Sequence, residues 1–167
     1  MESSGYQWGC VMVQVPIKNW QQIISQIQPE DVYDGGDDRH GIEDDPHLTL
    51  LYGLEPQITE EEIKKVFSDF EHEVTLKING IDTFNNEEYD VVKLNVEKTP
   101  ELQKLHDRLS ELPNHDSYPE YRPHITISYV KKGTGNKYVN PDFKMDIQGL
   151  NTICYSQPSG KRTYFEL

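Results

Sequence analysis

The sequence contains two similar stretches, PHLTLLYGL and, further along the chain, RPHITISYV. Each follows the pattern proline, histidine, aliphatic, threonine, aliphatic, any residue, tyrosine. Side chains alternate between the two faces of a β-strand, so a histidine and a threonine two positions apart share one face. These residues are His47 and Thr49 in one stretch, and His124 and Thr126 in the other. The aliphatic residues between them face the other way and can anchor each strand in a core.

Two histidines can divide the work of acid–base catalysis. A histidine titrates near neutral pH, so it can accept or donate a proton there. If one imidazole is neutral and the other is protonated, the pair can deprotonate a nucleophile and protonate a leaving group on the same substrate. Threonine hydroxyls beside them can donate hydrogen bonds to the non-bridging oxygens of an anion. The two pairs therefore predict cleavage of a phosphodiester, attacked by water or by a ribose 2′-hydroxyl.

This chemistry needs neither a metal ion nor another cofactor, and we expect none. Three acids, Glu43, Asp44 and Asp45, precede the first stretch, and a histidine with neighbouring carboxylates can hold a metal. The second stretch has no such run of acids beside it. Acids are also common throughout this chain, so three of them near a histidine give little support to a metal site.

The rest of the chain must position the two stretches, and its apolar pattern predicts helices and strands in mixed order. One helix is expected over residues 18–27. A second begins at Thr59, where Glu62 completes a capping box, and a third begins after Thr99 with Pro100 at its first position. Strands are predicted over residues 9–17, 47–54, 74–79, 92–96, 125–130, 143–147, 152–156 and 162–165.

This mixed order predicts an α+β fold with mostly antiparallel sheet. The length suits a single domain, which we place at residues 1–167. Residues 28–45 are polar and contain Gly35-Gly36, so we expect a mobile loop there, close to the first stretch.

Composition restricts the partners of the protein. The 167 residues carry a formal net charge of −13, which repels the backbone of a long nucleic acid but permits a small phosphate ligand in a locally polar site. No apolar run is long enough to span a membrane, and the first residues do not resemble a signal peptide. We expect the thiols of Cys10 and Cys154 to be reduced. We expect a cytoplasmic monomer that acts on a small substrate.

Paired His-x-Thr motifs on strands with aliphatic neighbours resemble those of the 2H phosphoesterases. That family includes RNA 2′,3′-cyclic phosphodiesterases and the so-called 2′-5′ RNA ligases. The resemblance implies two pseudo-symmetric lobes with helices outside, facing a central cleft into which each lobe contributes one motif. It carries a catalytic role to His47, Thr49, His124 and Thr126.

Within the family, the sequence PHLTLLYGL is similar to the corresponding motif of phage anti-CBASS nucleases. The resemblance implies cleavage of 3′-5′ linkages in small cyclic oligonucleotides, the signals of a bacterial antiviral defence, and a location in the host cytosol if a phage encodes the protein. Two alternatives stay open. One is an RNA-end enzyme that opens 2′,3′-cyclic phosphates, and the other is a module that binds cyclic nucleotides without cutting them.

Strict alternation also places the remaining residues of the two stretches. It puts Leu51 and Ser128 on the face of the histidines, where Leu51 would touch a base or ribose and Ser128 would bind phosphate. It puts Tyr52 and Tyr129 on the opposite face, where packing is the favoured interpretation.

Four residues outside the shared pattern complete the candidate substrate contacts. Tyr6 and Trp8 precede the first strand and are equally consistent with stacking on a base or with packing at the core edge. Lys131 and Lys132 follow the second stretch directly. A basic pair in so acidic a chain is a candidate phosphate contact, although a solvated turn is the usual role of such a pair.

Overall fold

The computed structural model describes residues 7–36, 40–70, 73–116, 118 and 120–167. Eight strands form one sheet in the order β6-β3-β4-β5-β2-β1-β7-β8, and every paired neighbour is antiparallel. The strands are β1 (Gly9–Gln14), β2 (His47–Leu54), β3 (Val74–Asn85), β4 (Tyr89–Val96), β5 (His124–Lys131), β6 (Asn140–Leu150), β7 (Thr152–Ser156) and β8 (Arg162–Glu166). The predicted α+β class with mostly antiparallel sheet is confirmed.

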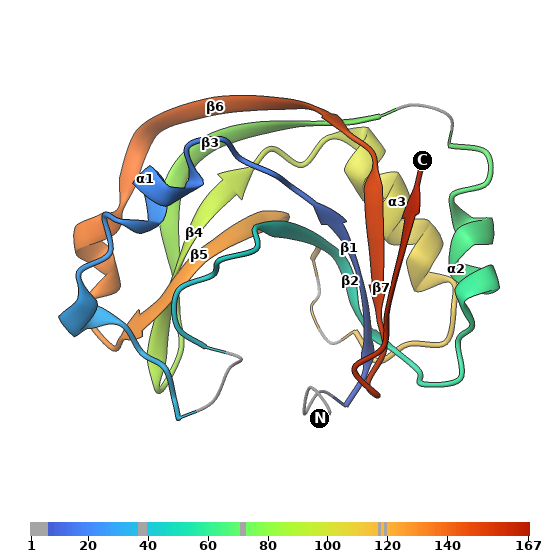
Figure 1. The fold of residues 1–167 in the computed structure, drawn as a ribbon, viewed down its shortest axis with the longest axis horizontal. Coiled ribbons are helices and arrows are strands. Elements are labelled where there is room, and N and C mark those ends of the chain that lie inside the picture. The colour runs from blue at the N-terminus through green and yellow to red at the C-terminus, as the bar shows by residue number, and fades with distance from the viewer. Residues whose placement is uncertain (1–6, 37–39, 71–72, 117, 119) are drawn as a thin grey trace.

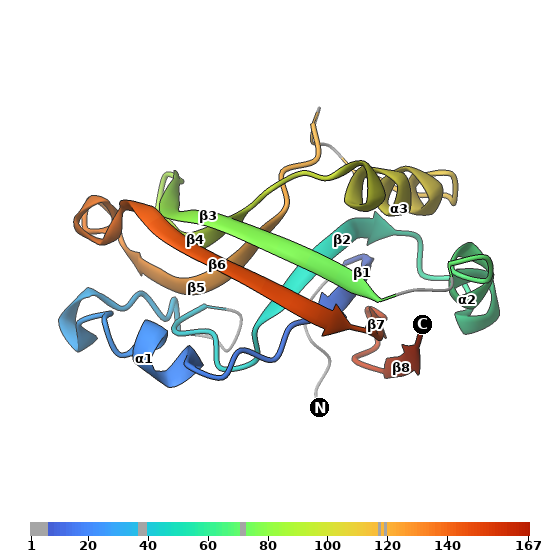
Figure 2. The same cartoon turned by 90° about the horizontal axis from the view of Figure 1, so that it is seen from above.

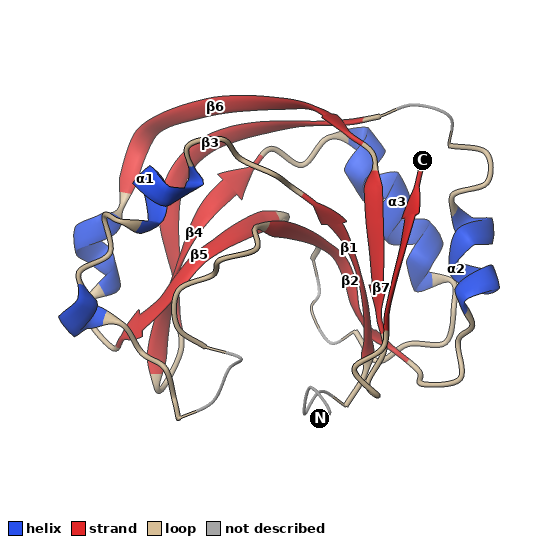
Figure 3. Ribbon diagram, in the orientation of Figure 1, coloured by secondary structure: helices blue, strands red, loops and turns tan. Residues whose placement is uncertain are grey.

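The sheet bends into an arch, with its helices on the outer side (Figure 1). Helix α1 (Trp20–Ile24) lies at one flank, whereas α2 (Glu60–Val66) and α3 (Pro100–Ser110) lie at the other (Figure 3). Seen from above, α1 and α3 sit on opposite sides of the long strands β3 and β6 (Figure 2). Two short 3-10 helices, Pro29–Asp31 and Gly135–Tyr138, lie in connections. None of the helices in the described part of the chain is long and apolar enough to cross a membrane.

The predicted starts of the second and third helices are confirmed in detail. Thr59 accepts a hydrogen bond from the amide of Glu62 at 3.2 Å, and the Glu62 carboxylate accepts one from the amide of Thr59 at 3.1 Å. Thr99 caps α3 by accepting from the amide of Leu102 at 3.2 Å. The buried face of α3, which packs against β2, consists of Leu102, Leu105 and Leu109.

Strands β2 and β5 lie at the centre of the sheet and meet at one paired position, Leu48 opposite Ile125. Both of these residues are fully buried and belong to the continuous core on the outer side of the arch. Beyond this point the two strands separate. The site residues therefore lie where the two halves of the sheet join.

Each central strand is then covered by the segment that precedes the other. The amide of Glu43 donates to Ile127 O at 2.9 Å, and the amide of Tyr129 donates to the carbonyl of Gly41, also at 2.9 Å. In the same way residues 113–115 run along β2, where the amide of His115 donates to Gly53 O at 2.8 Å. The described part of segment 28–45 is thus hydrogen-bonded to β5, which differs from the loop that we expected.

Candidate active site

The antiparallel register around Leu48 and Ile125 brings the two motifs together. It sets His47 beside Thr126, and Thr49 beside His124. All four side chains are half-buried and lie on the face opposite the core, which is the inner side of the arch. Two histidines and two hydroxyls thus share one small area, with the histidines on a diagonal.

The flanking strands extend this area on both sides. On β1, Gln14 lies opposite His47 and Met12 lies opposite Thr49. On β4, Asn95 lies opposite His124 and Lys93 lies opposite Thr126. We call these eight residues the floor of the site; its two rows are Gln14, His47, Thr126, Lys93 and Met12, Thr49, His124, Asn95.

Both histidines are held by the same backbone contact. His47 Nδ1 lies 3.0 Å from Asp45 O, and His124 Nδ1 lies 2.9 Å from Arg122 O. A carbonyl only accepts, so each Nδ1 carries a proton that it donates. In a neutral ring Nε2 is then the free base, and in a charged ring Nε2–H is the acid. The contact therefore fixes the tautomer that both proton transfers require.

The prediction that Leu51 and Ser128 lie on the same face as the histidines is wrong. In β2 the register steps from Thr49 opposite Met12 to Leu51 opposite Val11, so Leu50 is an extra residue, a β-bulge. The bulge turns Leu51 into the core, where it is 2% exposed.

Strand β5 has a bulge at the equivalent place, because Ile127 is extra between Thr126 and Ser128. Ser128 is fully buried, and its hydroxyl lies within hydrogen-bond distance of the carbonyls of Gly41 and Tyr129. Its predicted place on the inner face is therefore also incorrect.

The same bulges move the tyrosines to the inner face, contrary to the prediction. Tyr52 pairs with Cys10 and is 37% exposed. Tyr129 pairs with Val91 on β4 and packs edge-on against Tyr89 at 5.3 Å and against His40 at 4.9 Å. On the inner face, each of the two motif strands thus presents a histidine, a threonine and a tyrosine, in that order.

The other predicted contacts are placed as follows. Trp8 stacks on His115 with ring centroids 4.1 Å apart, so one face of its indole already has a partner. Lys131 is exposed at the end of β5, opposite Tyr89. Lys132 donates to the carbonyl of Asn86 at 2.5 Å. Tyr6 lies outside the described residues.

Sequence reasoning missed several residues of the floor. Lys93 is only 7% exposed; its ammonium donates to Asn95 Oδ1 and lies 4.2 Å from the centroid of the Phe84 ring. Gln14 Nε2 is buried without a hydrogen-bond partner, beside His47. The available signal was a lysine inside an otherwise apolar strand, VVKLNV.

The two cysteines occupy the neighbouring strands. Cys10 and Cys154 are both free thiols. Burial raises the pKa of Cys10 to about 12, although a hydrogen bond with Thr49 opposes that shift. Such a thiol is protonated at neutral pH and is a poor nucleophile. In the described part of the chain, no group of three or more histidine, cysteine or acidic side chains is arranged to hold a metal.

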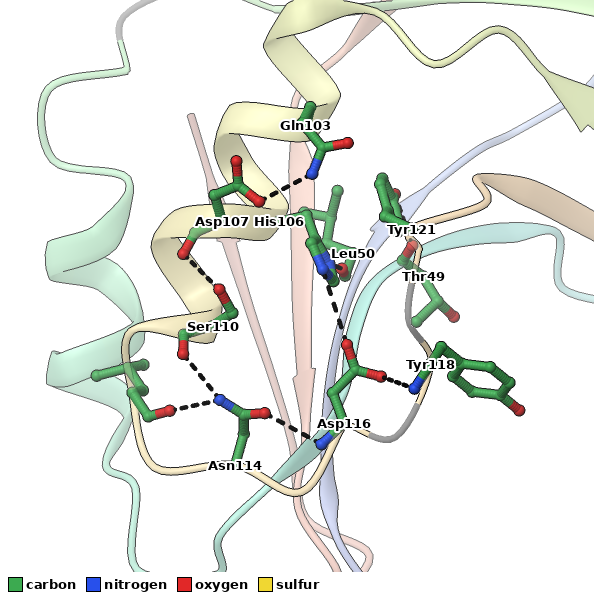
Figure 4. A network of polar contacts seen from close by, with 11 residues as sticks. Thr49, Leu50, Gln103, His106, Asp107, Ser110, Asn114, Asp116, Tyr118 and Tyr121 are labelled. Atoms are coloured by element: carbon green, nitrogen blue, oxygen red, sulfur yellow. Dashed lines mark hydrogen bonds and ion pairs between the residues drawn. The ribbon is translucent and has the colours of Figure 1, made fainter.

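A polar network supports the bulge of β2 from its outer side (Figure 4). The hydroxyl of Tyr121 donates to Thr49 O at 2.9 Å, and His106 Nδ1 on α3 donates to Leu50 O at 2.6 Å. The two rings stack 4.4 Å apart with an interplanar angle of 8°. Asp116 Oδ2 lies 3.8 Å from His106 Nε2. Tyr121 precedes β5, so its hydroxyl links the approach to the second motif with the backbone of the first.

Comparison with known sequences and structures agrees with this geometry. The 2′-5′ RNA ligase superfamily matches residues 15–153. No curated protein matches. Among solved structures, Usb1 from Kluyveromyces marxianus superposes with a TM-score of 0.64 at 8% identity, covering 98% of this chain and 99% of that one.

A second solved structure, E. coli LigT complexed with 3′-AMP, superposes with a TM-score of 0.60 at 19% identity, covering 96% of this chain and 95% of that one. At such identities the superpositions establish the fold. The sequence match establishes the family, because it spans most of the chain. The chain therefore belongs to the 2′-5′ RNA ligase superfamily and is a phosphodiesterase of the 2H type.

Proposed function

We propose that this phosphodiesterase cleaves 3′-5′ linkages in small cyclic oligonucleotides and serves phage counter-defence against CBASS signals. The observation that carries the catalytic part is the matched pair of imidazoles, each holding a protonated Nδ1 against a backbone carbonyl on the same face of the sheet. The substrate class rests on the resemblance of PHLTLLYGL to phage anti-CBASS nucleases. It is also consistent with the charge of −13, which disfavours long nucleic acids.

The proposed reaction uses the four motif residues and routes no step through a metal. Nε2 of one histidine takes the proton of the attacking water or ribose 2′-hydroxyl. The new P–O bond forms, the bond to the leaving oxygen breaks, and Nε2–H of the other histidine protonates that oxygen. Thr49 and Thr126 donate hydrogen bonds to the non-bridging oxygens as their charge increases.

RNA-end processing is the second candidate, and one finding favours it. Solved structures with this fold include LigT complexed with 3′-AMP and Kluyveromyces marxianus Usb1 with uridine monophosphate. A mononucleotide in those proteins fits an enzyme that opens terminal 2′,3′-cyclic phosphates. The two candidates use the same residues and differ in the size of substrate that the inner face accepts.

One incubation separates the candidates. Purified protein is mixed with a cyclic dinucleotide, a cyclic trinucleotide and a 2′,3′-cyclic mononucleotide, and the products are identified by mass. We expect linear products from a cyclic oligonucleotide, and we expect none with His47→Ala or His124→Ala, which should retain the circular dichroism spectrum of the wild type. Opening of the mononucleotide alone would favour RNA-end processing. Binding of a cyclic oligonucleotide without cleavage would favour a module that only captures the signal.

A further inference from the structure

The floor of the site is close to two-fold symmetric at its centre but not at its edges. An approximate two-fold axis between β2 and β5 relates the two histidines, the two threonines, and the amides of Gln14 and Asn95. The same operation relates Met12 on β1 to Lys93 on β4. One half of the floor thus carries an apolar thioether where the other carries an ammonium.

Lys93 is placed as a functional cation rather than as a surface lysine. Burying an ammonium is costly unless nearby groups compensate for lost water. Its compensation comes from Asn95 Oδ1 and the face of Phe84, whose ring in turn packs edge-on against His124 at a centroid distance of 4.9 Å and an angle of 85°. Burial lowers the pKa of Lys93, and Asp82, opposite it on β3, opposes that shift and favours the charged ammonium. The side chain is thereby fixed next to one histidine.

The charged groups around His124 are mainly cationic. Lys93 on β4 and His47 on β2 lie diagonal to it and act on it electrostatically, and the residue two positions before it, whose carbonyl accepts from its Nδ1, is Arg122. The acid Asp82 lies opposite Lys93 on β3. A proton on His124 would therefore be added beside existing positive charge.

The surroundings of His47 have the opposite sign. Burial raises the pKa of the Glu43 carboxyl, while its electrostatic interaction with His47 opposes that shift, and the residue two positions before His47 is Asp45. Glu43 has a sequence equivalent in Glu120, four positions before His124, but Glu120 is exposed and pairs with Lys98 at 3.3 Å. The acids that accompany His47 thus have no unpaired equivalent beside His124.

We propose that Lys93 makes the two histidines unequal: its buried ammonium keeps His124 in the neutral, proton-accepting form, so that His124 takes the proton of the nucleophile and His47 donates to the leaving oxygen. This assignment of proton transfers rests on the proposed function. Lys93 acts through His124 and is a positioning residue for charge. Burial first, and then the charges of Lys93 and His47, lower the pKa of His124, which agrees with the geometry.

The test replaces Lys93 by methionine, the residue at its symmetric position. The imidazole signals of ¹³C-labelled protein are followed by NMR against pH, and the pH profile of kcat/KM is measured on whichever nucleotide is cleaved. We expect Lys93→Met to raise the titration midpoint of His124 by about one unit. The acidic limb of the rate profile should move up by the same amount. Lys93→Gln, which keeps a donor for Asn95, carries the same expectation if the methionine variant does not fold.

Lys144→Met is the matched control, because it removes the same charge from an exposed position on edge strand β6. It should leave both readings unchanged. An unchanged His124 midpoint in Lys93→Met would overturn the inference even if cleavage is observed. An acidic limb of the rate profile whose midpoint matches that of His47 instead of His124 would also overturn it. If no nucleotide is cleaved, the proposed function fails, while the NMR titration still decides the effect of Lys93.

Discussion

The hydroxyl of Tyr121 offers the sharpest test of how the two motifs are held together. Leu48 and Ile125 form the one paired position between β2 and β5, so the bond from Tyr121 to Thr49 O is a second direct link across this junction. Tyr121→Phe removes that bond and leaves the ring stacked on His106. A lost hydrogen bond to a part-buried carbonyl costs about 1 to 2 kcal/mol. For a domain of this size that corresponds to a fall in Tm of roughly 3–6 °C.

Activity should fall further than stability alone explains. Thr49 binds a phosphoryl oxygen in the proposed reaction, and small displacements of positioned groups reduce rates steeply. We expect kcat to fall by about tenfold at a temperature where the variant is fully folded. The assays are urea denaturation for the free energy of unfolding and cleavage under saturating substrate for kcat.

Tyr155→Phe supplies a matched control. Its buried hydroxyl donates to Ile58 O at 2.7 Å, away from the floor. This variant should lose similar stability with kcat unchanged. Equal losses of kcat in both variants, or no loss of stability in Tyr121→Phe, would refute the idea that Tyr121 positions the first motif.

Three further predictions concern the cap of α2, the pKa of His124 and the need for a metal ion. Thr59→Ala removes the capping box of α2 and should lower the free energy of unfolding by about 1 kcal/mol in urea denaturation, without changing cleavage. The pKa of His124 is lower in the folded state than in the unfolded state, so the unfolded state binds more protons between the folded pKa and about pH 6.5, and the free energy of unfolding should fall as the pH drops through that range. In a His124→Gln variant this pH-dependent loss should shrink. The same dependence of the free energy of unfolding on pH in both proteins would contradict a lowered pKa of His124. Cleavage should be unaffected by EDTA, and inhibition reversed by added metal would count against the proposed mechanism.

Much of the fold could be predicted from local patterns. The caps at Thr59 and Thr99 involve residues three positions apart, so the sequence contains both partners. The first helix is shorter than expected, Trp20–Ile24, yet the chain continues in turns whose amides bond three residues back, and Ile27 still packs in the core. The first strand ends at Gln14 instead of continuing to residue 17, because Pro16 has no amide to donate.

The errors arise where the strands depart from regular alternation. A bulge adds one residue at Leu50 and another at Ile127, which reverses every face assignment after the threonine. Consecutive aliphatic residues are equally compatible with a buried regular strand, so the sequence alone does not reveal the bulge. Lys93 was missed for a different reason, because its place beside Thr126 depends on a strand pairing that joins distant segments.

The bulges and the unequal edges together explain how a duplicated motif can catalyse a directional reaction. Two identical half-sites would bind a phosphodiester equally well in either direction, and nothing would make one histidine the base and the other the acid. The bulges are shared, so they give both strands the same order of histidine, threonine and tyrosine on the inner face. Direction must then come from residues that the motif does not contain. Lys93 opposite Thr126 and the acids before His47 are such residues, since Lys93 acts electrostatically on His124 and Glu43 acts on His47.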